Sequence, residues 1–189
     1  MFTHVIYHKA CPDGFASAYV AWKVLGNNSR YIPQAYYDKL PDIKDSKILV
    51  CDFSFNEEET IKLIKENESY FNIDHHKSAF ENLHDIEDKY KYFDINHSGA
   101  VLTWKYFFPN DEIPFFIKLI EDYDLWKFNY KETKPFMIAL NEMKFNFKDW
   151  KQFEDVNFLN EFIKKGKILE SYQNSLVIYH LHLLLNYQY

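Results

Sequence analysis

The chain has 189 residues, of which 47% are hydrophobic and 20% aromatic, and it carries a formal net charge of -6. This apolar content excludes a disordered acidic chain, and the length favours one globular domain with a helical appendage and no second globular domain. The negative charge argues against general binding of duplex nucleic acid, because no basic field is present to attract the phosphates.

Composition also bears on location and on ligand contacts. The N-terminus lacks the basic segment and long apolar run of a signal peptide, and no stretch is apolar enough to span a bilayer, so we expect a cytoplasmic protein with no membrane partner. The two cysteines, Cys11 and Cys51, do not have the spacing of a zinc knuckle or a disulfide framework. The 22 basic residues include a single arginine, Arg30, so phosphate contacts are expected from lysine, histidine and backbone N–H groups.

The first part of the chain alternates between predicted strands and helices. Apolar runs predict strands over residues 2–8, 30–37, 47–52 and 70–73, and Pro33 places the second of these near a sheet edge. Helices are predicted over residues 13–24 and from a cap at Asn56 to about residue 67. The alternation predicts an α/β fold, a Rossmann-like, mostly parallel sheet flanked by helices.

The second part is predicted to be mostly helical. A strand is expected over residues 90–95, followed by helices over residues 98–108, 115–122, 134–144 and from 157 to the end. We therefore expect an α/β domain over residues 1–155 and a C-terminal helical extension over residues 156–189. The apolar end of this extension is a candidate homodimer contact, through Leu181, Leu183, Leu184 and Leu185.

Metal-binding side chains follow three of the predicted strands. His8 and then Asp13 follow the first, Asp52 follows the third, and Asp74, His75 and His76 follow the fourth. Open α/β sheets bind ligands in the crevice at the carboxyl ends of their strands, and aspartate and histidine are ligands for divalent ions. These positions therefore predict a metal site at the carboxyl edge of the sheet.

Five segments in this order resemble the motifs of the DHH phosphoesterase superfamily. They are residues 8–14 (HKACPDG), 51–54 (CDFS), 74–79 (DHHKSA), 98–100 (SGA) and 122–126 (DYDLW). The family includes RecJ-type exonucleases, oligoribonucleases, cyclic-dinucleotide phosphodiesterases and family-II inorganic pyrophosphatases. The resemblance implies a metal-dependent hydrolase with one or two Mn²⁺ or Mg²⁺ ions. Relatives commonly continue into a second, substrate-binding domain, which we do not expect in this chain.

The resemblance also implies roles for individual residues. Asp52 is expected to be shared by two ions, His76 to face the scissile phosphate, and Asp74 to orient the imidazoles. The substrate phosphate is expected near Lys77, His97, Ser98 and Gly99, the last two at a helix N-terminus whose N–H groups favour an anion. The expected metal ligands are His8, Asp13, Asp52, His75 and Asp124.

Two assignments stay open at this point. Asp122 competes with Asp124 for the last ligand position. The first motif has one carboxylate where relatives have two, so either Cys11 or Phe15 stands in place of the other. We favour Cys11, which makes it a candidate ligand, and a thiolate suits Zn²⁺ better than Mg²⁺ or Mn²⁺.

The expected substrate is a short nucleotide-containing phosphodiester or phosphomonoester, such as an oligoribonucleotide, a cyclic dinucleotide or a nucleotide phosphate. Inorganic pyrophosphate is a less favoured substrate, because the pyrophosphatases of this family use a basic second domain. The alternative is a catalytically weak nucleotide-binding or scaffold protein, which the missing carboxylate of the first motif favours.

Overall fold

The computed structural model describes the backbone of residues 1–186 and the side chains of residues 1–178. The chain divides into two compact units, Met1–Leu125 and Trp126–Tyr189. This division lies earlier than the boundary expected after residue 155. The reason is that helices α6 (Thr133–Leu140) and α8 (Val156–Asn186) pack against each other within the second unit.

The first unit contains the predicted sheet. Five strands lie in the order β2-β1-β3-β4-β5, and every pair is parallel, so the expected α/β fold is confirmed. Pro33 lies in β2 at the edge of the sheet, as its lack of an N–H donor requires. The strands are β1 (His4–His8), β2 (Arg30–Gln34), β3 (Lys47–Cys51), β4 (Ser69–Asp74) and β5 (Lys91–Phe93).

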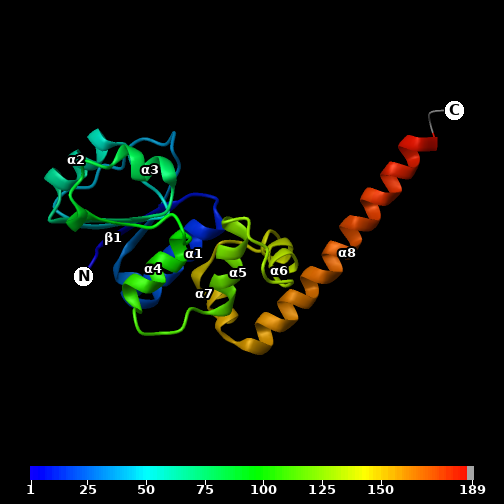
Figure 1. Ribbon diagram of the computed structural model, residues 1–189. Coiled ribbons are helices and arrows are strands. Elements are labelled where there is room, and N and C mark those ends of the chain that lie inside the picture. The colour runs from blue at the N-terminus through cyan, green and yellow to red at the C-terminus, as the bar shows by residue number, and fades with distance from the viewer. Residues whose placement is uncertain (187–189) are drawn as a thin grey trace. The chain divides into compact units, whose positions relative to one another are not determined.

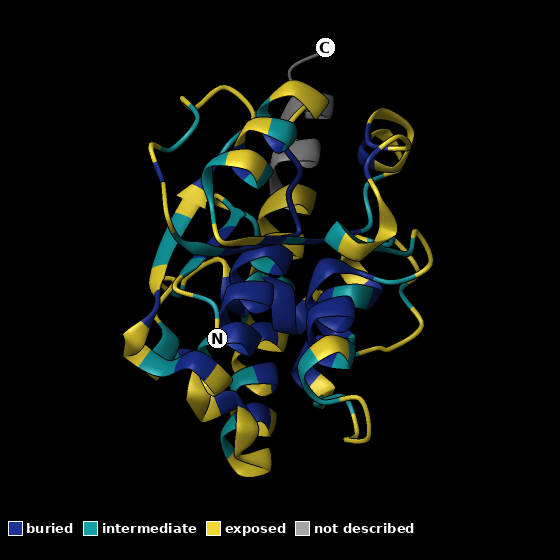
Figure 2. Ribbon diagram, turned by 90° about the vertical axis from the view of Figure 1, so that its left-hand side faces the viewer, coloured by how far each residue is buried: buried dark blue, intermediate teal, exposed yellow. Residues whose placement is uncertain are grey.

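The strands are apolar on both sides because both faces of the sheet are covered. Along β3, Ile48 and Val50 belong to one buried cluster, while Leu49 and Cys51 belong to the other. This is the period-two alternation of a strand between two layers. In Figure 2 such buried residues are dark blue, and the exposed residues, in yellow, lie mainly on loops and outer helix faces.

Helices cover the two faces. Helices α1 (Pro12–Leu25) and α4 (Gly99–Phe107) pack on each other on one face, and Figure 1 shows α2 (Glu57–Glu66) and α3 (Lys77–Asn82) on the other. Asn56 caps α2 as predicted, since its side chain accepts a hydrogen bond from the N–H of Glu59. Helix α3 was not predicted, because six residues give too short a pattern. Helix α5 (Phe115–Asp124) packs against α1 and α4.

The second unit is helical, as predicted for this region. It contains α6, α7 (Phe147–Trp150) and α8, and Gly166 lets α8 approach α6 closely, because a Cβ there would overlap the carbonyl of Pro135. The four leucines expected to form a dimer contact lie outside the residues whose side chains are described. Within the described residues, no helix is long and apolar enough to cross a membrane. The described backbone also contains 3-10 helices at Gly26–Asn28, Asp88–Tyr90 and Lys151–Glu154.

The strand order fixes where a ligand site can form. The chain leaves β1 through α1 toward β2, and it leaves β3 through α2 toward β4 on the other side. The two connections diverge, so a crevice opens between the carboxyl ends of β1 and β3. His8 ends β1, and Asp52 directly follows β3.

Candidate metal centre

Asp52 lies at the middle of the crevice with a backbone that few residues adopt. Its φ is 52°, in the left-handed region, which aspartate tolerates better than most residues. Its N–H still donates to the carbonyl of Ile73 at 2.9 Å, so the residue stays tied to β4 while its backbone turns. Its side chain is 1% exposed. Such strained positions are commonly held in place at functional sites.

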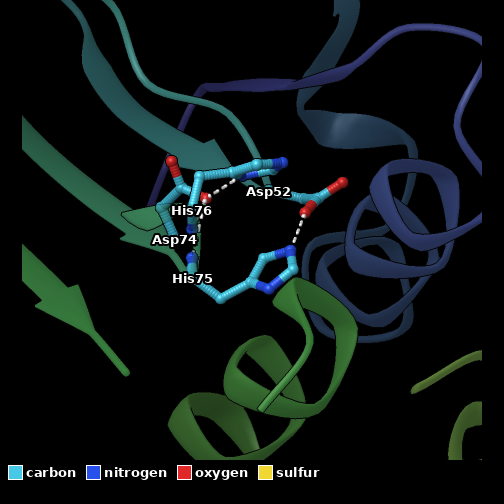
Figure 3. Close-up of side chains that lie close together, drawn as sticks. All are labelled: Asp52, Asp74, His75 and His76. Carbon is cyan, nitrogen blue, oxygen red and sulfur yellow. Dashed lines mark hydrogen bonds and ion pairs between the residues drawn. The ribbon is translucent and has the colours of Figure 1, made fainter. Parts of the chain in front are cut away.

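His75 joins Asp52 to two further carboxylates. Its Nε2 atom lies 3.0 Å from Asp52 Oδ1, the contact drawn in Figure 3, and 3.5 Å from Asp124 Oδ2. The same nitrogen lies 3.8 Å from Asp13 Oδ2. The chain therefore brings together one imidazole and three carboxylates from α1, the end of β3, the end of β4 and the end of α5.

The N-terminus of α4 holds Asp13 in place. The Gly99 N–H donates to Asp13 Oδ2 at 2.7 Å, and the Ala100 N–H donates to Oδ1 at 3.2 Å. A Cβ on Gly99 would lie 2.6 Å from Asp52 Cβ, so only glycine permits this approach. In this structure the helix N-terminus binds the carboxylate of Asp13, and the phosphate-binding role expected of Ser98 and Gly99 stays a prediction.

His8 and Cys11 lie on the other side of Asp52. His8 Nδ1 is 3.6 Å from Asp52 Oδ2, beyond hydrogen-bonding distance, and both atoms are buried without a hydrogen-bond partner. The Cys11 sulfur belongs to the same group, whose ligand atoms all lie within 4.8 Å of one another. Burial, and then the neighbouring Asp52, raise the pKa of the Cys11 thiol, so it is protonated unless a cation displaces the proton.

The charges of this cluster favour a cation. Asp13 and Asp52 are each 1% exposed, and the ion-pair partners of Asp13, Asp52 and Asp124 are histidines. Burial, and then the charge of Asp52, raise the pKa of Asp13 well above its usual range, and burial raises the pKa of Asp124. Burial alone would also raise the pKa of Asp52, but the hydrogen bond from His75 and the nearby His8 lower it overall. Buried carboxylates in such proximity are stabilised by a bound divalent ion.

Asp74 positions His76. Its Oδ1 atom accepts from His76 Nδ1 at 2.7 Å and from the backbone N–H groups of His75 and His76 at 2.7 and 3.2 Å (Figure 3). Its Oδ2 atom accepts from the Ser54 hydroxyl at 2.5 Å. The hydrogen bond to Asp74 raises the pKa of His76 to about 9. Because Asp74 holds Nδ1, the ring nitrogen of His76 left for a further ligand is Nε2.

The geometry distinguishes Asp124 from Asp122 and Cys11 from Phe15. Asp124 Oδ2 contacts His75, whereas Asp122 is buried and belongs to none of the metal-capable groups of the described residues. Phe15 is buried with its ring centroid 5.9 Å from that of Tyr7, and Cys11 lies with His8 and Asp52. Asp122 and Asp124 are two apart on α5 and so point about 200° away from each other, which leaves one of that pair facing the crevice.

Two residues expected near the phosphate have other partners. His97 Nδ1 lies 2.8 Å from Glu121 Oε1, and its Nε2 lies 2.7 Å from Lys105 Nζ. Lysine only donates, so His97 Nε2 accepts, and neither ring nitrogen is left for a phosphate. The phosphate contact expected of His97 stays a prediction, and it would require His97 to exchange one of these partners. Lys77 lies on the exposed face of α3 with its Nζ 3.8 Å from Glu81, and its expected phosphate contact remains a prediction.

Ser54 and Asn72 are not among the site residues predicted from the sequence. The Asn72 side-chain amide donates to Ser54 Oγ at 2.7 Å, and Ser54 in turn donates to Asp74, which makes a buried chain leading to His76. A signal for it was present, because Asn72 is a polar residue in the otherwise apolar run of β4. Buried polar residues require partners, and the end of the neighbouring strand supplies them.

Comparisons with known proteins give the fold but no activity. No protein-family model matches the chain. It is 31% identical over 186 residues to uncharacterized protein R106 of Acanthamoeba polyphaga mimivirus, a match that covers 89% of this chain and 44% of that protein. It also resembles the crystal structure of an uncharacterized protein from Helicobacter pylori G27, with a TM-score of 0.62 and 16% identity over 87% of this chain and 62% of that one. The chain therefore spans less than half of its curated relative and less than two thirds of the solved chain.

Proposed function

We propose that this protein is a metal-dependent phosphoesterase of the DHH type, which hydrolyses a phosphodiester or phosphomonoester of a short nucleotide-containing substrate. One observation carries the proposal. Asp52 joins two groups of ligand-type atoms: its Oδ1 contacts His75, which groups with Asp13 and Asp124, and Asp52 itself belongs to a group with His8 and Cys11. A carboxylate shared in this way is the arrangement that two-ion phosphoester hydrolysis needs. The sequence motifs resembling DHH phosphoesterases provide independent support.

The residues present fit one hard divalent ion well. Asp13, Asp52, His75 and Asp124 offer carboxylate oxygens and one imidazole nitrogen, which suit Mn²⁺ or Mg²⁺. On the other side, Asp52 Oδ2 and His8 Nδ1 are the buried atoms without hydrogen-bond partners, and Cys11 adds a soft ligand. Ions bound there would supply Lewis-acid activation of the phosphate and of water.

His76 is suited to assist the leaving group. Asp74 fixes its ring orientation and its Nδ1 proton, so the other ring nitrogen can hold or donate a proton at a phosphoryl or departing oxygen. Ser54 and the backbone N–H groups of His75 and His76 also donate to Asp74, so this carboxylate is held in place by hydrogen bonds. We therefore assign Asp74 to positioning and His76 to catalysis.

The second candidate function is nucleotide binding with little turnover, as in a scaffold protein. The observation that favours it is Cys11, a half-buried thiol at a position where a hard ligand would support the second ion. Such a protein would bind an ion through Asp13, Asp52, His75 and Asp124 alone and hold a phosphate without cleaving it.

A hydrolysis panel separates the two functions. The full chain would be assayed with Mn²⁺, Mg²⁺ and Zn²⁺ against p-nitrophenyl phosphate, a linear dinucleotide and a cyclic dinucleotide, with nucleotide binding measured in parallel. A phosphoesterase is expected to cleave at least one nucleotide substrate in an ion-dependent manner. Tight nucleotide binding with no cleavage under any ion would favour the scaffold function and contradict the phosphoesterase.

A further inference from the structure

A small pocket of about 180 Å³ adjoins the metal centre and has no role in the mechanism above. Its size is below the range of about 300–1,000 Å³ for drug-sized ligands, so it fits one ring system and not a whole dinucleotide. Three segments form its walls: the end of β2 with the loop after it, the loop between β3 and α2 with the first turn of α2, and helix α3. Its aromatic lining residues include Tyr36 and Phe53, and its polar ones include Asn56, Glu59, Ser78 and Asn82.

The pocket touches the residues of the metal centre. The Tyr36 ring centroid lies 5.5 Å from that of His8 and 4.9 Å from that of Phe53. Ser54, which also lines the pocket, donates to Asp74, and Ser78 follows two residues after His76. A phosphoester bound between His8 and His76 would thus place its organic substituent within reach of this pocket.

One wall of the pocket is aromatic. Tyr36 is 53% exposed, whereas Phe53 is 2% exposed and supports the tyrosine ring from beneath. An exposed ring backed by a buried ring is a rigid platform for stacking, because the tyrosine loses little freedom when a flat ligand covers it. Stacking on such a platform is a general way to bind bases without a basic groove.

The polar lining residues can form hydrogen bonds, and none of them is positively charged. Ser78 and Asn82 offer donors and acceptors, Asn56 offers its side-chain N–H groups because its oxygen caps α2, and no lysine or arginine lines the pocket, so a phosphate is not its expected ligand. Of its two carboxylates, Asp38 is already paired with Lys9 Nζ at 3.2 Å and with the Ala35 N–H at 3.1 Å. Glu59 has no ion pair among the described residues, so its oxygens can accept hydrogen bonds from a ligand.

We propose that this pocket binds a nucleobase of the substrate, stacked on Tyr36, with its hydrogen-bonding edge toward Asn56, Asn82 and Glu59. The inference rests on the proposed function for the identity of the substrate, but the binding itself does not need the metal centre. A carboxylate acceptor favours bases whose edge carries N–H donors, so guanine is expected to bind more tightly than uracil.

The test uses nucleosides, which have no phosphate and so report on the pocket alone. Binding of guanosine, uridine and ribose to the full chain would be measured by calorimetry or NMR for the unmodified protein, Tyr36→Ala and Tyr37→Ala. Tyr37 is the matched control because it is adjacent in sequence, fully exposed and outside the pocket. Guanosine is expected to bind the unmodified protein and the Tyr37 variant, with affinity reduced about tenfold or more in Tyr36→Ala.

A second variant tests the polar edge. Glu59→Gln is expected to weaken the binding of guanosine more than the binding of uridine. An equal loss of affinity for both nucleosides would contradict the assigned edge. The whole inference is wrong if guanosine does not bind the unmodified protein, if Tyr36→Ala binds it unchanged, or if ribose binds as well as the nucleosides. Circular dichroism of each variant shows whether it is folded, and Tyr36→Phe, which keeps the ring, is expected to restore binding.

Kinetics separate this inference from the proposed function. If a dinucleotide is hydrolysed, Tyr36→Ala should raise its KM about tenfold, with a much smaller effect on an analogue lacking the base. If no substrate is hydrolysed but guanosine binding depends on Tyr36, the proposed function fails and the pocket stands. If hydrolysis proceeds and Tyr36→Ala affects both substrates equally, the pocket assignment fails and the proposed function stands.

Discussion

The two sides of Asp52 differ in what they offer a cation. On one side, Asp13 and Asp124 supply carboxylates and His75 an imidazole, and the N-terminus of α4 holds Asp13 by hydrogen bonds. On the other side, His8 and Cys11 supply one imidazole and one thiol, and two polar atoms are left without partners. Under the proposed function, the first side would take Mn²⁺ or Mg²⁺, and the second would take a softer or more weakly held ion. The difference indicates that the two ion positions would fill unequally.

The largest expected effect comes from the residue common to both sides. Asp52→Asn keeps the shape of the side chain but removes the shared charge, so ion-dependent hydrolysis should fall to background and neither ion should bind tightly. Hydrolysis assays and metal analysis by mass spectrometry would measure this. Asp42→Asn, at an exposed position outside the site, is the control. Full activity in a folded Asp52→Asn protein would refute the two-ion proposal.

The next effect should separate catalysis from metal binding. His76→Ala leaves all the assigned ligands in place, so ions should bind as before while turnover falls by about 10²–10⁴-fold. The measurements are kcat and metal titration, with His84→Ala as the matched variant, since the His84 side chain is 70% exposed. Loss of the metal in His76→Ala would show that His76 is a ligand.

A smaller effect should appear when a carboxylate replaces the thiol of Cys11. Cys11→Asp would give His8 and Asp52 a carboxylate partner, so Mn²⁺ binding to the weaker position should tighten on the order of ten- to a hundred-fold. Phe15→Asp should instead destabilise the protein, because Phe15 is 3% exposed and packs on Tyr7. Calorimetry with Mn²⁺ checks both variants, and the opposite ranking would reverse the assignment of Cys11 and Phe15.

The smallest effect concerns the stability of the metal-free protein. The pKa of His76 is raised to about 9, so its bond to Asp74 stabilises the fold fully below the unfolded pKa of about 6.5 and is lost as the pH rises through about 9. The melting temperature of EDTA-treated protein should therefore fall by a few degrees over this range because of His76. In His76→Gln this part of the pH dependence should be absent, and identical pH profiles for the two proteins would contradict it.

Much of the fold follows from local patterns in the sequence. Apolar runs in the first half marked the strands, and Asn56 before three glutamates marked the start of α2, because these preferences act over a few neighbouring residues. The strand ends carrying His8, Asp52 and Asp74 could also be read in advance, since parallel strands present their carboxyl ends at one edge. The short helix α3 could not, because six residues carry too little pattern.

The details of the site were decided by tertiary structure. The sequence alone marked the N-terminus of α4 as an anion site, but only packing showed that the anion is the side chain of Asp13. The partners of His97 likewise come from elsewhere, from Glu121 on α5 and Lys105 on α4. Residue type and spacing determine which chemistry a segment can offer. The rotation of each helix and the approach of distant segments determine which of those side chains face the crevice, because such contacts join residues far apart in the chain.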